Sequence, residues 1–261
     1  MGPTLISAVR HGESEANLAY QEAGTTPLVY ERGDDEVTLT ELGRLQAAAL
    51  GRLLAALPAG EAPEQVWCSP YLRALDTWRH AQKAAGQAAR RASQETAQEG
   101  AQEAAQVAGD EGAQGAWDGD RVPVVVDARL RDQEAGEFAR YNLAAIERLY
   151  PEELARRDAE GAYAFRPPGG ESLGDVVARL RDFLADLRER ADGQRVLIVA
   201  HDSVVLGLRH VLARSPDAEL AAVLGYAPVL NASVSIWRTN GGRPELLQFN
   251  DVAHLVRGRN A

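Results

Sequence analysis

The sequence predicts an α/β protein with parallel strands, and three observations support this prediction. Short apolar runs at residues 5–9, 65–69 and 195–200 indicate buried strands, and each precedes a segment with a helical pattern. The run at 195–200 is apolar after its first residue, which is typical of a central parallel strand. With 261 residues, 45% of them hydrophobic, the chain can bury one sizeable core, so we expect a single domain over residues 1–261.

A polar motif follows the first strand directly. Arg10, His11 and Gly12 come after the apolar run, and a short helix is expected to continue through Tyr20. Ligands of open α/β sheets bind at the carboxyl ends of the strands, and Gly12 lets the backbone turn tightly there. A guanidinium grips two oxygens of an anion in a planar fork, and a neutral imidazole can act as a nucleophile or proton carrier. The motif therefore predicts an anion site.

The loop between the first two strands carries an acidic triplet, Asp34–Glu36. Three successive acidic side chains point in different directions, and no histidine or further acid lies nearby at ligand spacing. We therefore expect a solvated turn here and not a metal site. Thr40 then caps a helix that Pro58 and Gly60 end.

The second strand also ends in a motif that suits an anion. Ser69 closes the strand, Pro70 begins the next helix, and Arg73 falls in its first turn. The N-terminus of a helix is itself favourable for negative charge. Cys68, the single cysteine, lies in the same apolar run, so it is expected in the core and cannot form an internal disulfide.

The composition changes abruptly between about residues 84 and 120, where Ala, Gln, Glu and Gly dominate. Alanine favours helix, but the segment has no apolar stripe to bury, and several glycines interrupt it. We expect a solvent-exposed insert, first a helical extension and then a mobile loop. It is expected to carry no chemistry, and a docking role is the alternative.

Two later segments add acidic residues and a second histidine. After a strand at 122–127 come Leu130, Asp132, Glu134 and Gly136; after the strand at 195–200 come His201 and Asp202. Asp202 is either the N-cap of the next helix or a functional acid. Between the two, Glu171–Ser172 is expected to cap an amphipathic helix, and Arg166 or Glu171 could contact a substrate. A further strand is expected at 231–237, and an antiparallel one at 245–249.

Taken in order, these motifs resemble the histidine phosphatase superfamily, also called the phosphoglycerate-mutase-like family, in its broad-specificity phosphatase branch. The likeness rests on Arg10–Gly12, the Ser69–Arg73 segment, the Leu130–Gly136 segment and His201, and on the loop Pro167–Ser172. It implies a three-layer α/β/α sandwich with a mostly parallel sheet and a cap formed by insertions. Two positions depart from the pattern: Asp132 stands where Glu is more usual, and Asp202 stands where Gly usually follows the histidine.

The resemblance also implies roles for the site residues. His11 would attack phosphorus and become phosphohistidine, and Arg10, Arg73 and a protonated His201 would bind the non-bridging oxygens. Asn17 could donate one more hydrogen bond. Asp132 is the first choice to protonate the leaving alkoxide, and Glu134 and Asp202 are alternative donors; in the acid-phosphatase branch an Asp directly after this histidine has that role. No metal or cofactor is implied. His80, His210 and His254 lie outside the motifs and are assigned no function.

The function expected from this resemblance is a metal-independent phosphomonoesterase acting on a small phosphorylated metabolite. A cofactor-dependent phosphoglycerate mutase is the alternative, although it would need further basic residues in the cap to hold a second phosphate. A second alternative is an inactive phosphatase-fold binding protein, which the intact Arg-His-Arg-His set argues against. A homodimer is consistent with the resemblance.

Charge and hydropathy limit the other partners. Acidic residues outnumber basic ones, 38 to 28, for a formal net charge of −10, so nucleic acids and anionic membranes are not expected partners. An anion site must therefore be a local cluster of Arg and His. No apolar run is long enough to span a bilayer, and no signal peptide is recognised. Together with the single cysteine, this predicts a cytoplasmic protein.

Overall fold

The computed structural model describes residues 2–58, 60–103, 117, 119–216, 220, 228–239 and 243–257. Within these residues the strands form one six-stranded sheet in the order β3-β2-β4-β1-β5-β6. The bounds are β1 (Leu5–Arg10), β2 (Gln65–Cys68), β3 (Val124–Val126), β4 (Arg195–Ala200), β5 (Val234–Arg238) and β6 (Glu245–Asp251). The first four strands of that order run parallel, whereas β5 and β6 pair antiparallel at one edge. The mostly parallel sheet is confirmed, as are the two strands near the C-terminus.

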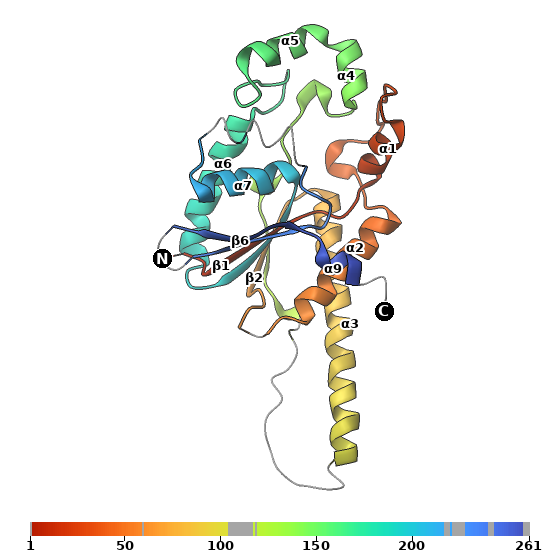
Figure 1. Ribbon diagram of the computed structural model, residues 1–261, viewed down its shortest axis with the longest axis vertical. Helices are drawn as coiled ribbons and strands as arrows, with labels where there is room; N and C mark the ends of the chain where they lie inside the picture. Colours follow the sequence, from red (N-terminus) through yellow and green to blue (C-terminus); the bar gives the residue numbers. More distant parts are fainter. Residues whose placement is uncertain are drawn as a thin grey trace.

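Helices cover both faces of this sheet, which confirms the three-layer arrangement (Figure 1). The side chains of β4 alternate between two cores: Val196 and Ile198 pack with α6 (Leu173–Arg190) and α7 (Asp202–Ala213), and Leu197 and Val199 pack with α2 (Glu41–Ala55) and α3 (Leu72–Glu103). Successive residues of a strand point to opposite faces, so a fully apolar β4 requires cover on both sides. A short helix, α9 (Ala253–Arg257), lies against α2. Among the described residues, no helix combines the length and the apolarity that crossing a bilayer requires.

Helical insertions beyond the carboxyl ends of the parallel strands form the cap that the resemblance implies (Figure 1). They are α1 (Glu15–Ala23), α4 (Leu143–Leu149) and α5 (Pro151–Glu160), and Tyr150 is the only residue between α4 and α5. Asn142, the N-cap of α4, accepts a hydrogen bond from Leu28 N at 2.9 Å and donates to Thr26 O at 2.8 Å. These bonds fix the loop after α1 against the rest of the cap.

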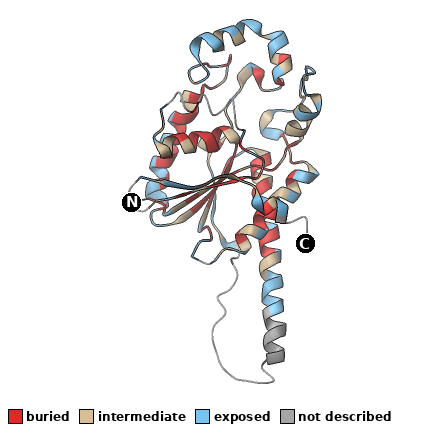
Figure 2. Cartoon of the chain, viewed as in Figure 1, coloured by how far each residue is buried: buried red, intermediate tan, exposed pale blue. Residues whose placement is uncertain are grey.

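The alanine-rich insert divides into a packed part and an exposed part. Ala81, Ala84 and Ala85 are buried, and Trp117 packs edge-on against Trp78 with ring centroids 6.4 Å apart. The expectation of a wholly solvent-exposed insert is therefore wrong for its first turn, because small side chains let α3 approach α2 closely. Beyond it the helical extension is present, and residues 90–95 are exposed, as the lower part of α3 in Figure 2 shows. Most of the expected mobile loop, 104–116 and 118, lies outside the described residues.

Two glycines bring the first motif into backbone contact with α2. A Cβ atom added to Gly12 would lie 2.5 Å from Gly43 O, and one added to Gly43 would lie 2.0 Å from Glu13 O. At the same place Thr40 caps α2 by accepting a hydrogen bond from Gly43 N at 3.0 Å. The loop that carries His11 therefore packs directly on the first turn of α2.

We predict that Gly43→Ala lowers the free energy of unfolding by roughly 1–3 kcal/mol, because the added methyl group overpacks this contact. That cost exceeds the gain of about 1 kcal/mol that alanine brings to a helix relative to glycine. Denaturant unfolding measures the change. Gly60→Ala is the matched control, since nothing lies within 4 Å of a Cβ atom there; equal effects of the two substitutions would contradict the packing account.

Candidate active site

The predicted residues converge on one cavity of about 190 Å³ at the carboxyl ends of β1 and β4. Its lining consists of Arg10, His11, Ser14, Ala16, Asn17, Tyr20, Tyr30, Arg32, Asp34, Val37, Arg73, Asp132, Ala139 and Asp202. His201 lies directly beside this set, with its ring centroid 5.3 Å from that of His11. The structure thus brings together Arg10, His11, Asn17, Arg73, Asp132, His201 and Asp202, and leaves Glu134 outside.

Hydrogen bonds on both ring nitrogens orient His11. Its Nδ1 lies 2.7 Å from Gly12 O, and Arg73 Nε donates to its Nε2 at 3.2 Å. Both contacts fit the tautomer in which Nδ1 carries the proton and Nε2 offers its lone pair. Burial, and then the charges of Arg73, His201 and Arg10, lower the pKa of His11 well below its usual 6.5. His11 is therefore a neutral imidazole whose basic nitrogen lies beside a guanidinium.

Arg73 is the best-connected cation in the cavity and is only 4% exposed. Its Nη2 lies 2.9 Å from Asp132 Oδ2, and its Nη1 lies 3.0 Å from Asp34 Oδ1. Burial alone would lower the pKa of Arg73, but Asp132 and Asp34 more than offset this and raise it. One fixed positive charge thus faces one imidazole and two carboxylates.

His201 directly follows β4, is the N-cap of α7 and is fully buried. Its Nε2 forms a 2.8 Å hydrogen bond with Ser69 Oγ, and its Nδ1 lies 3.4 Å from Asp132 Oδ2. Burial lowers the pKa of His201 to about 3, against the opposing effect of Asp132. Before an anion binds, His201 is therefore neutral and offers the site hydrogen bonding only. The positive charge of the site comes from Arg10 and Arg73.

The three candidate acids have different environments. Asp132 accepts hydrogen bonds from Ser203 Oγ at 2.7 Å and Gln133 N at 2.9 Å. Burial opposes its ionisation, but His201, Arg73 and the Ser203 hydroxyl outweigh that and place the pKa of Asp132 well below its usual range.

Asp202 behaves in the opposite way. It lines the cavity as the first residue of α7, so it is not the N-cap, and burial raises its pKa against the attraction of Arg10. The side chain of Glu134 is 46% exposed and pairs with Arg131 at 2.8 Å. Asp132 and Asp202 therefore remain as acids that face the cavity.

Arg10 and Asn17 complete the predicted set. Arg10 Nη1 donates to Val229 O at 2.5 Å, which holds the guanidinium at the cavity wall. Asn17 Oδ1 accepts from Ser14 N at 3.2 Å and from Asn231 Nδ2 at 3.1 Å. Since that oxygen closes the capping box of α1, the Asn17 amide nitrogen is the atom that can donate to a bound anion.

The structure corrects the expectation for the acidic triplet. Asp34 is not part of a solvated turn: its carboxylate and its backbone carbonyl both accept hydrogen bonds from Arg73. Asp35 and Glu36 are exposed as expected. The buried guanidinium of Arg73 attracts the nearest acid, and periodicity cannot identify which of three adjacent acids turns inward. Tyr20, Tyr30 and Ser203 were missed as well, because isolated hydroxyl residues carry no sequence signal, and Ser69 was placed in a motif but given no role in the site.

Arg166 and Glu171 do not line the cavity. Arg166 pairs with Asp175 on the surface, and Glu171 pairs with Arg131 and, at 3.1 Å, with Arg179. Arg179 Nη2 in turn donates to Asp132 O at 3.1 Å. The buried Glu171–Arg179 pair therefore supports the backbone that carries Asp132.

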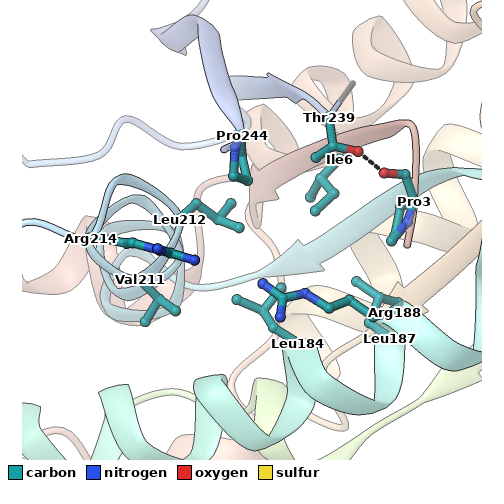
Figure 3. A pocket seen from close by; sticks show the side chains of 10 residues that line it. All are labelled: Pro3, Ile6, Leu184, Leu187, Arg188, Val211, Leu212, Arg214, Thr239 and Pro244. Carbon is teal, nitrogen blue, oxygen red and sulfur yellow. Dashed lines mark hydrogen bonds between the residues drawn. The ribbon is translucent and has the colours of Figure 1, made fainter. Parts of the chain in front are cut away.

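A second cavity, of about 250 Å³, lies near the start of β1, far along the strand from His11 (Figure 3). Ile6, Leu184, Leu187 and Leu212 form much of its wall, and the guanidiniums of Arg188 and Arg214 point over it. Among the described residues, its lining offers Arg188, Arg214 and the Thr239 hydroxyl but no carboxylate, imidazole or thiol, so it lacks the acid, base and imidazole nucleophile that the smaller cavity holds. The candidate active site is the smaller cavity.

Comparisons with known proteins find similar sequences and structures along nearly the whole chain. The family model described as the histidine phosphatase superfamily (branch 1) matches residues 6–99 and 101–252. A 2,3-bisphosphoglycerate-dependent phosphoglycerate mutase 2 from Gloeobacter violaceus is 32% identical, over 77% of this chain and 72% of its own length. A metal-independent phosphoserine phosphatase from Arabidopsis thaliana is 25% identical, over 97% of this chain and 83% of its own. The structure of Bacillus stearothermophilus YhfR shares the fold, with a TM-score of 0.70 at 22% identity and coverage of 97% and 99%.

We predict that His11 and His201 stay neutral when the pH falls from 7 to 5.5, because burial lowers the pKa of both below 6.5. Nitrogen-15 NMR of histidine-labelled protein measures this, with His11→Gln and His201→Gln assigning the signals. His11 is expected to show a protonated Nδ1 and an unprotonated Nε2. The unfolded chain binds more protons than the folded one below pH 6.5, so the free energy of unfolding decreases as the pH falls through that range. Protonation of His11 near pH 6.5 would contradict the site as described.

Proposed function

The chain belongs to the histidine phosphatase superfamily, branch 1, and on that premise we propose that it is a metal-independent phosphomonoesterase acting through a phosphohistidine intermediate on a small phosphorylated metabolite. The observation that carries the proposal is the state of His11. Gly12 O holds the proton on Nδ1, so Nε2 is the unprotonated nitrogen, and Arg73 Nε donates to its lone pair at 3.2 Å, a bond that must be released when Nε2 attacks phosphorus. A nucleophile is thus set beside the charge that a phosphate dianion needs.

The proposed first step is attack of His11 Nε2 on phosphorus. The N–P bond forms, the ester P–O bond breaks, and a carboxylic acid gives its proton to the leaving oxygen. Gly12 O stabilises the positive imidazole through its Nδ1 proton, while Arg10 and Arg73 neutralise the non-bridging oxygens. In the second step water attacks phosphorus, the N–P bond breaks, and the carboxylate takes the proton from water. No metal is required, since His11 supplies the nucleophile and the guanidiniums supply the charge.

Two carboxyl groups compete for the role of proton donor. Asp132 lies next to both Arg73 and His201, and we propose it as the donor because a bound phosphate dianion would draw Arg73 away from it and raise its pKa. The observation that favours Asp202 is its raised pKa in the cavity wall, where burial disfavours the carboxylate. A neutral carboxylic acid is the form that donates.

The mutase alternative is less well supported by the cavity. A mutase must hold a second phosphate or carboxylate at the mouth, which calls for free cationic side chains there. The mouth contributes Asp34, and Arg32 is already paired with Glu15 at 2.7 Å. The names of relatives include both a mutase and a phosphatase, so this local charge is what favours the hydrolase. An inactive binding protein is disfavoured by the complete set of His11, Arg73 and His201. We further propose that the ester is a small molecule, that the protein acts in the cytoplasm, and that a homodimer is its assembly.

We predict that His11→Ala lowers kcat for p-nitrophenyl phosphate by at least about 10³-fold, because the nucleophile is lost. Rapid quenching of the wild-type protein should trap acid-labile phosphate on the chain, and the variant should trap none. His80→Ala serves as the control and should retain both properties. Unchanged hydrolysis by His11→Ala would refute the phosphohistidine mechanism.

The donor is identified by its dependence on the leaving group. An alkoxide needs a proton and p-nitrophenolate does not, so loss of the donor should slow alkyl phosphate hydrolysis by about 10²–10⁴-fold and affect p-nitrophenyl phosphate little. We predict this pattern for Asp132→Asn and a smaller, uniform effect for Asp202→Asn. The reverse pattern would assign the role to Asp202. Glu134→Gln is the control and should change neither rate.

A further inference from the structure

We propose that the cavity selects phosphate monoesters whose leaving group carries a positive charge, such as an ammonium, and that Asp34 is the residue that determines this specificity. The inference rests on the proposed phosphatase function and adds a substrate class to it. Its starting point is that Asp34 lies in the cavity lining and is paired with the same arginine that a phosphate would use.

Asp34 and a phosphate compete for Arg73. The carboxylate of Asp34 lies 3.0 Å from Arg73 Nη1 and 3.3 Å from Nη2, and its backbone carbonyl accepts a further bond from the same group. Asp132 occupies Nη2 as well, at 2.9 Å. A guanidinium has five N–H donors in a fixed fork, and the Nε–H of Arg73 already donates to His11 Nε2. A phosphate dianion that binds both Nη groups of Arg73 must therefore displace Asp34 as well as Asp132.

Displacement leaves Asp34 without its cation in a partly enclosed site. The Asp34 side chain is 36% exposed, and burial already raises its pKa against the attraction of Arg73. An unpaired carboxylate there disfavours a leaving group with a negative charge and favours one with a positive charge. The hydrogen bonds that Asn142 makes to Leu28 and Thr26 anchor the same loop to α4. The anchored loop limits how far Asp34 can move away.

The wall next to Asp34 suits an ammonium group. Tyr20 and Tyr30 line the cavity and meet edge to face, with ring centroids 6.1 Å apart. Aromatic faces attract cations, and the attraction is stronger where the ring is shielded from water. Tyr20 and Asp34 line the same cavity, and burial, followed by the charge of Asp34, raises the pKa of Tyr20. The nearby cation Arg32 is paired with Glu15 at 2.7 Å, at 53% and 39% side-chain exposure, so the outer rim adds little net positive charge.

Three esters of similar size test the proposal: phosphoethanolamine with a cationic leaving group, n-propyl phosphate with a neutral one and phosphoglycolate with an anionic one. For the wild-type protein we expect kcat/KM to fall roughly tenfold at each step in that order, as one partly screened charge pair would produce. In Asp34→Asn the spread should shrink to within about threefold, mainly through faster turnover of phosphoglycolate. Asp35→Asn is the matched control, because it removes an adjacent, exposed acid and should keep the wild-type order.

The outcomes are distinguishable. An unchanged order in Asp34→Asn, or a wild-type preference for phosphoglycolate, would overturn the specificity proposal. Failure of the wild-type protein to hydrolyse p-nitrophenyl phosphate would contradict the proposed phosphatase function itself. Circular dichroism and the Tm of Asp34→Asn show whether the variant is folded. If it is not, Asp34→Glu keeps the charge and should keep the order of the three esters.

Discussion

The geometry of the cavity depends on the contact between Arg73 and His11. The guanidinium donates to His11 Nε2 and at the same time pairs with Asp132 and Asp34. Burial disfavours a second proton on the His11 ring, and the permanent positive charge beside the ring adds to this effect. His201 and the same charge lower the pKa of Asp132. One buried arginine therefore contributes to the protonation state of two groups and pairs with a third.

The fold brings these groups together by placing their backbones on adjacent elements. β1 and β4 are neighbouring parallel strands, so their ends deliver His11 and His201 to one edge of the sheet. Arg73 comes from the first turn of α3, just after β2, the neighbour of β4 on its other side. The contact between Gly12 and Gly43 then fixes the position of the loop that carries His11 relative to the edge of the sheet. Each position follows from strand order and a close helix contact.

The sequence predicted the parts of the molecule that repeat a simple pattern. Apolar runs located the parallel strands, and polar residues at their ends located Arg10, His11 and His201, because buried parallel strands need continuous apolar sequence and ligands bind where they end. The inward turn of Asp34 was not predictable, since it depends on a cation 39 residues away in the chain. The protonation of Asp132 and Asp202 also depends on burial and on neighbours from distant segments. The burial of the first turn of the insert was not predictable either, because alanine occurs both in close helix contacts and on surfaces.

The long helix α3 has a first part that packs in the core and a later part that is exposed. Its first turns share a core with α2 and the sheet, whereas residues 90–95 have exposed side chains. Helical turns without tertiary packing are marginal in water, so amide hydrogens there should exchange with solvent through local opening, long before the core opens globally. We expect the same stretch to be cleaved early in limited proteolysis. The nucleophile at the opposite end of the sheet is separated from that fraying by a fully packed helix segment.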